Sequence, residues 1–367
     1  MRYFQQSLSF IICSIFFTVS ATAQTTISAY RPGVTPEGAV YCLPRTALRI
    51  SVLVERTTYK PGDFASYAKR YLRLQDVSLE PATSYQVLSI TQMTFGQADP
   101  KKIYAIKFDA RTVAANVALA EDGRLLALNA KPAEEAQPKT FTPAPKTSLP
   151  NPRQFMTEEI IAAGSTAKMA ELTSQEIYDL RENRNLLIKG QADFMPKDGQ
   201  QLKLMLEQLQ TQESALRSLF EGTTVRDTTE YILTYIPDAK LHSKEVLFRL
   251  SQQLGMVEAD DLSGEPFYIA IDDITPQPPK EEETDAKDKK TVKKKEYEAG
   301  VYVNIPGRMR STIYQGIEQL GQAEFPAAQF GNVELLSADL FNKRYTTQLW
   351  LNPVTGAIER LQAEMKK

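Results

Sequence analysis

The sequence predicts an α+β protein made mainly of β-strands, and three observations lead to this class. Most of the chain consists of short runs rich in β-branched and aromatic residues, separated by turn residues. One stretch, 157–220, instead repeats apolar residues at helical spacing. A proline-rich segment, 131–153, lies between that stretch and the preceding β-segments. We therefore expect an N-terminal β domain with one short helix, a central helical pair and a C-terminal antiparallel β region.

The length of 367 residues is enough for two or three domains, each with its own core. The composition and the turn signals predict five segments. They are a signal peptide (1–23), the N-terminal β domain (24–130), a proline-rich linker (131–153), the helical pair (154–222) and the C-terminal β region (223–367).

The first residues have the pattern of a secretory signal peptide. Arg2 precedes an apolar core, 8–19, and Ala21 and Ala23 form a small-x-small cleavage site. The apolar run is too short to span a bilayer comfortably, although a retained anchor is the alternative interpretation. We expect an exported chain that begins at Gln24 and has no membrane-spanning segment after signal cleavage.

The N-terminal β domain is predicted from strand-like runs at 38–43, 47–57, 84–95, 102–108, 116–120 and 124–129. The turn at 60–63 leads into a short helix that aligns Phe64, Tyr67 and Tyr71 on one face. Helical aromatic spacing indicates core packing first. A stacking platform for a carbohydrate or peptide is the alternative.

The linker is predicted from its proline content. Its six prolines are Pro132, Pro138, Pro143, Pro145, Pro150 and Pro152. Proline at this density prevents both helices and central strands and favours an extended spacer. A proline-rich docking ligand is the alternative.

The helical pair is predicted to form a helical hairpin or coiled coil. The first helix begins at Thr157, is interrupted around Gly164 and ends at Gly190. Asp198 and Gln201 have the spacing of a capping box for the second helix. The apolar stripe of the second helix contains Leu202, Met205, Leu206, Leu209, Leu216, Leu219 and Phe220. We interpret the pair as a brace tied to the C-terminal β region, with the N-terminal β domain as the more independent body.

The C-terminal β region contains the remaining strand-like runs, at 223–237, 246–250, 266–271, 301–305, 311–314, 331–335, 346–351 and 357–361. The charge-rich, low-complexity segment 275–298 is predicted to be a disordered loop. Trp350, the single tryptophan, is expected in the core rather than at a binding site.

The chain lacks the residue sets of common catalytic and metal sites. His242 is the single histidine, and Cys42 is the single cysteine after the signal peptide, so the usual zinc sets are absent. No G-x-S-x-G elbow, phosphate-binding loop or dinucleotide fingerprint occurs. Cys42 is expected to be a buried, inert thiol. We therefore predict no catalytic residue, no cofactor and no metal, and the net charge of -2 gives no reason to expect nucleic acid as a partner.

Carboxylates are the one remaining route to catalysis. Asp260, Asp261 and Glu265 lie close together in the sequence, with Asp272 and Asp273 shortly after them. Paired carboxylates are the machinery of glycosidases, and carboxylate groups also hold cations. A solvated turn is the favoured interpretation of this group.

Five stretches together resemble a known family. They are TTYKPGDFASYAKRYLRL (57–74), AGSTAKMAE (163–171), MPKDGQQLKLML (195–206), EADDLSGEPFYI (258–269) and NPVTGAIERL (352–361). The chain resembles an exported Bacteroidota family catalogued as a domain of unknown function, number 4831, over nearly its whole mature length. The resemblance implies a periplasmic or outer-membrane-associated location in a Gram-negative bacterium. It transfers no activity and no site residue.

These observations favour a non-enzymatic envelope protein that acts as a scaffold or binding module for a protein or glycan partner. The absence of a recognisable nucleophile, metal set or cofactor motif supports this interpretation. The alternative is a carboxylate-dependent glycan hydrolase.

Overall fold

A computed structural model describes residues 38–107, 116–134, 138, 140–145, 148–238, 244–276, 300–341 and 345–365. The predicted signal peptide and His242 lie outside these residues, as does nearly all of the predicted charged loop. The described chain is mainly antiparallel β-structure with a helical hairpin, which confirms the predicted α+β class.

One long strand, β1 (Gly38–Lys60), runs through the whole molecule. It pairs with β2 (Ala82–Lys107) on one side and with β5 (Thr223–Tyr235) on the other. These three strands form a three-stranded sheet, which we call the ribbon. The two strands predicted at 38–43 and 47–57 are therefore one. A register shift between Cys42 and Pro44 accommodates the proline that separates them. At about 3.3 Å per residue, β1 extends over about 75 Å.

A five-stranded sheet packs on the middle of this ribbon. It contains β6 (Glu245–Ser251), β7 (Gly255–Val257), β8 (Glu265–Asp273), β9 (Gly300–Gln315) and β10 (Glu318–Ser337), in the order β10-β9-β8-β6-β7. Alternate side chains of β1 face the five-stranded sheet, as its period-2 pattern requires. The apolar side chains buried between the two sheets include Leu48, Ile50, Val52, Val54, Phe248, Phe267, Ile269 and Ile313.

A four-stranded sheet covers one end of the ribbon. It contains β3 (Val117–Leu119), β4 (Leu125–Leu128), β11 (Tyr345–Leu351) and β12 (Ile358–Met365), in the order β12-β11-β4-β3. A short helix, η3 (Ala338–Phe341), precedes β11. The first residues of β1 and β9 share a second core with this sheet. The Tyr104 ring packs against this core and stacks on the exposed Tyr302 ring, with the centroids 4.3 Å apart.

The helices lie at the opposite end of the ribbon. They are η1 (Ala65–Tyr67), α1 (Ala68–Leu72), η2 (Pro152–Phe155), α2 (Glu158–Ile161), α3 (Thr166–Lys189) and α4 (Gly199–Glu221). The predicted interruption near Gly164 is confirmed, because α2 ends and Ser165 caps α3 there. Asp198 accepts a hydrogen bond from the Gln201 backbone N–H at 2.7 Å, so the predicted cap of α4 is also confirmed.

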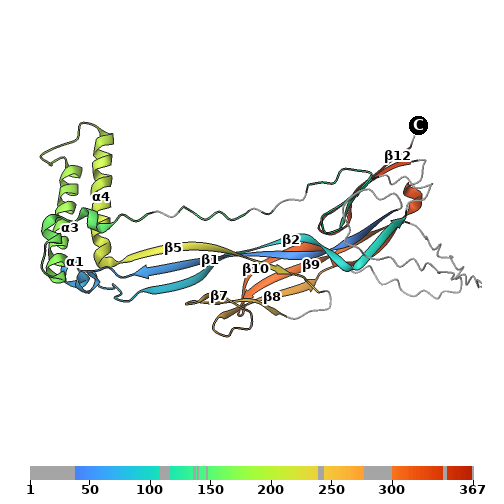
Figure 1. Ribbon diagram of the computed structural model, residues 1–367, viewed down its shortest axis with the longest axis horizontal. Helices are drawn as coiled ribbons and strands as arrows, with labels where there is room; N and C mark the ends of the chain where they lie inside the picture. Colours follow the sequence, from blue (N-terminus) through green and yellow to red (C-terminus); the bar gives the residue numbers. More distant parts are fainter. Residues whose placement is uncertain are drawn as a thin grey trace, which may run out of the picture.

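Figure 1 shows an elongated molecule in which the α3–α4 hairpin stands across one end of the ribbon and β12 lies near the other. The predicted linker runs between these ends along β5, and its described residues from 131 to 151 form neither helix nor strand. One contact along this path is the Phe141 backbone N–H, which donates to Glu230 on β5 at 3.4 Å.

Strands from the first and last segments share sheets. β1 pairs with β5, and β4 pairs with β11, although each pair lies far apart in the sequence. The expectation that the N-terminal β domain is the more independent body does not agree with this pairing, because two of the three sheets contain strands from both segments. The core of each shared sheet needs both contributions.

Two expected core residues are only half-buried. Trp350 is not in the core: its indole N–H donates to the Lys131 carbonyl at 3.1 Å, and the Arg360 guanidinium lies 5.0 Å from its ring centroid. Its neighbours Leu349 and Leu351 face inward instead, because side chains alternate along β11. Cys42 is also half-buried rather than buried. Burial still raises the pKa of its thiol, which disfavours the reactive thiolate.

Candidate functional site

The candidate site is an apolar groove at the tip of the α3–α4 hairpin. At the base of the hairpin, α1 packs against both helices as a third element. That base core is complete and includes Phe64, Ala68, Leu72, Ala170, Ile177, Leu180, Leu216 and Phe220. The predicted core role of Phe64 is confirmed here, since its ring lies 5.4 Å from that of Phe220, while Tyr67 and Tyr71 are partly buried beside it.

The distal half of the hairpin contains only α3 and α4 among the described elements. Two helices cannot enclose apolar residues on both sides of their contact. Several large apolar side chains of this half are accordingly exposed: Ile188, Phe194, Met195 and Leu204. Phe194 is 82% exposed, which is unusual for phenylalanine. The tip therefore presents apolar surface that the rest of the described chain does not cover.

A groove of about 550 Å³ lies between the two helices at this tip. Ten residues line it: Asn183, Leu186, Leu187, Ala192, Asp193, Phe194, Leu204, Met205, Gln208 and Leu209. Asp193 is the single charged member, and most of the lining is leucine, methionine and phenylalanine. The volume falls in the range typical of ligand and peptide sites.

The tip has a defined local structure. Gly190 adopts a left-handed conformation, with φ of 69°, and its N–H donates to the Leu187 carbonyl at 3.2 Å. The next N–H, from Gln191, donates to the Leu186 carbonyl at 2.8 Å, which completes a Schellman end. At the other side of the loop, Gln201 accepts from the Lys197 N–H at 3.1 Å. Both ends of the loop that carries Phe194 are therefore fixed.

Sequence reasoning missed this groove because it assigned the whole α4 stripe to a core. Two signals were available. Leu204 lies outside the stripe, and Phe194 and Met195 lie in the loop between the helices. Apolar residues in those positions have no core to enter.

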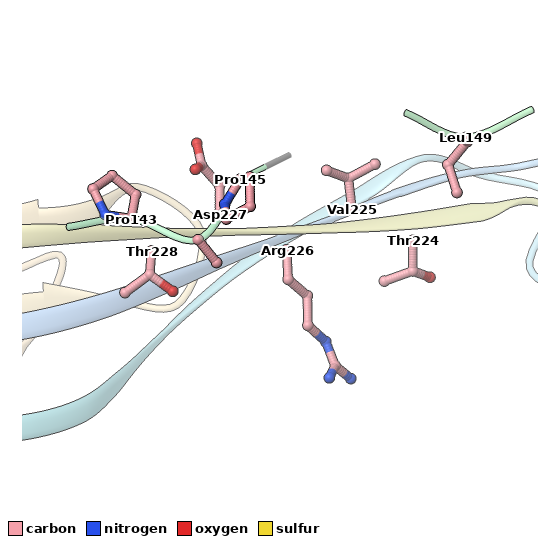
Figure 2. A pocket seen from close by; sticks show the side chains of 9 residues that line it. Pro143, Pro145, Leu149, Thr224, Val225, Arg226, Asp227 and Thr228 are labelled. Atoms are coloured by element: carbon pink, nitrogen blue, oxygen red, sulfur yellow. The ribbon is translucent and has the colours of Figure 1, made fainter. Parts of the chain in front are cut away.

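A second hollow, of about 260 Å³, lies between the linker and β5. Figure 2 shows Pro143 and Pro145 beside Asp227 and Thr228, with Leu149 near Val225 further along the strand. It is smaller than most ligand sites and has mixed polarity, as expected where an extended segment passes along a strand. We interpret it as a packing feature of the linker.

The carboxylates considered for catalysis lie at the two opposite ends of β8. Asp260 and Asp261 lie in an exposed turn before β8, and Glu265 begins that strand. Asp272 and Asp273 lie at its other end, about 25 Å from Glu265 at the usual rise per residue. Hydrogen bonds from Ser263 hold the pKa of Asp261 below its usual range, so this group favours the ionised form.

No cluster of three or more His, Cys, Asp or Glu side chains that could hold a metal ion occurs within the described ranges. Of the helices in those ranges, none is both long enough and apolar enough to cross a membrane.

These features define a class of elongated α+β protein in which a β-ribbon, packed against two further sheets, carries a helical hairpin at one end. The chain belongs to the family described as Domain of unknown function (DUF4831), whose profile matches residues 37–359. No curated protein and no solved structure matches the chain.

Proposed function

We propose that this protein is a non-enzymatic scaffold of the bacterial envelope that binds a helix of a partner protein in the groove at the hairpin tip. The observation that carries this proposal is the apolar groove at the hairpin tip, whose lining includes the exposed side chains of Phe194 and Leu204. The signal-peptide pattern before Gln24 supports export, and the resemblance to a Bacteroidota family supports an envelope location.

The base of the same hairpin indicates what the occupant is. There, α1 covers α3 and α4 and completes a three-helix core. The tip lacks the corresponding third element among the described residues. An amphipathic helix laid between Leu187 and Leu204 would cover the tip as α1 covers the base. The flexible thioether side chain of Met205 in the groove adapts readily to such a partner.

The size of the groove favours a partner helix over a second copy of this chain. Stable interfaces involve about 20–30 residues on each side. Ten residues line the groove, which is enough for two turns of helix with anchors at helical spacing. The lining also favours protein over glycan, since Asn183, Asp193 and Gln208 are its polar members and sugar recognition depends on dense hydrogen bonding.

Affinity capture from the native envelope, with the full chain as bait, tests this proposal. The test variant is Phe194→Ser with Leu204→Ser, and the control is Leu79→Ser, which alters a 61% exposed leucine outside the groove. We expect one protein to co-purify with the wild type and with the control. The amount of this protein that is captured should be at least tenfold lower with the test variant. A synthetic helix from that protein should compete for capture.

The variants also separate loss of binding from loss of folding. Phe194 and Leu204 are largely exposed, so the double variant should unfold within about 2 °C of the wild type. Equal capture by the wild type and the double variant would contradict the proposal. Capture of a glycan alone, or of a second copy alone, would contradict it as well.

A further inference from the structure

A second surface lies at one end of the five-stranded sheet, where three turns each expose a large apolar residue. Leu254 in the β6–β7 turn is 65% exposed, Leu262 in the β7–β8 loop is 82% exposed, and Ile317 in the β9–β10 turn is 98% exposed. The strand register brings these turns to the same end of the sheet, because Leu250 pairs with Glu265 and Phe267 pairs with Gln315. We call these three turns the apolar turn surface.

Hydrogen bonds join the β7–β8 loop to β6, and the start of β8 to the end of β9. Arg249 on β6 donates to the carbonyls of Ala259 and Gly264, at 2.8 and 3.1 Å, which holds both ends of the loop that carries Leu262. Gln315, at the end of β9, donates to Glu265 at 2.9 Å. The loop before β8 and the turn after β9 are therefore adjacent.

The exposed residues are held outward rather than left in loose chain. The Ser251 hydroxyl accepts from the N–H groups of Gln253 and Leu254, which fixes the β6–β7 turn. The same turn contacts the ribbon, since the Tyr85 N–H donates to the Gln252 carbonyl at 2.9 Å. Figure 1 shows this end of the sheet, with the β7–β8 loop, projecting from the side of the ribbon. A large exposed apolar patch, especially one rimmed by polar residues, marks an interaction site.

The charges around these residues are mainly negative, and Arg249, a cation that contacts the β7–β8 loop, donates to the backbone carbonyls of Ala259 and Gly264. Residues 250–271 and 315–323 contain five acidic residues, Glu258, Asp260, Asp261, Glu265 and Glu318, and no lysine or arginine. All five are exposed. An acidic rim repels anionic phospholipid headgroups and attracts a cationic partner.

We infer that the apolar turn surface docks a protein segment that is apolar and basic, in which leucine-like side chains contact Leu254, Leu262 and Ile317 and lysine or arginine side chains face the acidic rim. This inference does not depend on the hairpin groove. It gives the carboxylates around Asp260 a role in recognition rather than catalysis.

Two synthetic amphipathic helical peptides with identical leucines test the inference, one with lysine and one with glutamate at every polar position. We expect fluorescence anisotropy to show that the full chain binds the lysine peptide at least tenfold more tightly than the glutamate peptide. The variant Leu254→Ser, Leu262→Ser, Ile317→Ser should weaken lysine-peptide binding at least tenfold. Neutralising the rim by Glu258→Gln, Asp260→Asn and Glu318→Gln should weaken it and flatten its dependence on salt.

Three results would overturn the inference. They are unchanged binding by the triple serine variant, equal binding of the two peptides, and leucine-dependent co-sedimentation of the chain with phosphatidylglycerol vesicles. The Phe194→Ser, Leu204→Ser variant is the matched control. It should retain lysine-peptide binding, which separates this surface from the hairpin groove. All the altered side chains are exposed, so the melting temperatures should agree and confirm folding.

Discussion

The backbone N–H of Phe64 donates to the carbonyl of Leu219 at 2.7 Å, which joins the end of the β-ribbon directly to helix α4. Tyr59 strengthens the same junction, because its hydroxyl lies 3.0 Å from the Glu221 carbonyl. Helix α4 then leads through Gly222 into β5, where Thr223 pairs with Lys60. The hairpin is thus fixed to the ribbon, and its tip lies about 30 Å from the ribbon by the usual helical rise.

Replacing Gly62 should break this junction. A Cβ atom at Gly62 would lie 2.1 Å from the Leu219 carbonyl oxygen, so Gly62→Ala forces the ribbon and α4 apart. We expect a loss of about 1–3 kcal/mol in the free energy of unfolding and faster amide exchange in the last turns of α4. Gly164→Ala is the control, because a Cβ there meets no atom within 4 Å. Equal stability of the two variants would exclude a tight junction.

Glu213 should hold the two long helices together. Its carboxylate on α4 accepts hydrogen bonds from Arg181 at 2.6 Å and Arg184 at 2.8 Å, both on α3. The Glu213 side chain is nearly buried, and the two arginines are partly exposed. We expect Glu213→Ala to lower the free energy of unfolding, measured by chemical denaturation, by about 1–3 kcal/mol, because it leaves two cations without their shared partner.

The matched control for Glu213 is Glu207→Ala. Glu207 lies on the exposed side of α4 with Lys203 at 3.8 Å, and such pairs contribute about 0.5 kcal/mol or less. If both variants lost the same free energy, the ion pairs of Glu213 would have no special structural role.

Asn304 should stabilise the contact between the four-stranded sheet and the ribbon. Its fully buried amide donates to the Pro44 carbonyl at 2.9 Å and to the Thr355 carbonyl at 2.8 Å. Asn304→Ala leaves both carbonyls without this donor and should lower the free energy of unfolding by about 2 kcal/mol. Asn332→Ala, at an exposed position of β10, should change it by less than about 0.5 kcal/mol. If Asn304→Ala left the free energy of unfolding unchanged, Asn304 would be dispensable at this contact.

Glu176 on α3 should make stability depend on pH. Burial raises its pKa, and the Asp179 carboxylate raises it further. The Glu176 carboxyl group therefore binds its proton more tightly in the folded chain than in the unfolded chain. As pH rises from the pKa that Glu176 has in the unfolded chain through its higher pKa in the folded chain, the free energy of unfolding falls. Glu176→Gln should raise the melting temperature at pH 7.

The gain from Glu176→Gln should disappear near pH 3, where glutamate is protonated in both states. Differential scanning calorimetry at the two pH values measures this, with Glu182→Gln, an exposed position of the same helix, as the control. A gain of equal size at both pH values would exclude ionisation as the cause.

The helices could be predicted closely because their ends depend on local residues. Ser165, Gly190 and Asp198 act within one turn of their own positions, so the sequence around them is sufficient. The pairing of β1 with β5 could not be predicted in the same way, because it joins residues more than 160 positions apart. Local patterns carry no information about which distant strand becomes the neighbour.

Some strands could not be predicted because their residues have low strand propensity. The first part of β10 contains Gly321, Pro326, Ala327 and Ala328, which have low strand propensity, and the prediction found only the segment from 331 onward. Ala327 and Ala328 are fully buried, so tertiary packing outweighs propensity there. The candidate site was missed for a related reason, since helical spacing alone does not distinguish a stripe that is covered from one that is left open.

Site-specific photo-crosslinking at Leu204, in the full chain expressed in its own organism, tests whether the hairpin tip binds a partner helix. We expect a crosslink from position 204 to a helical segment of one other protein, and no such product from the control position Leu79. Phe194→Ser should reduce the crosslink severalfold. Two results would contradict the claim that the hairpin tip is a partner-binding site. One is a crosslink only within this chain or to a second copy of it, and the other is the same set of products from positions 204 and 79.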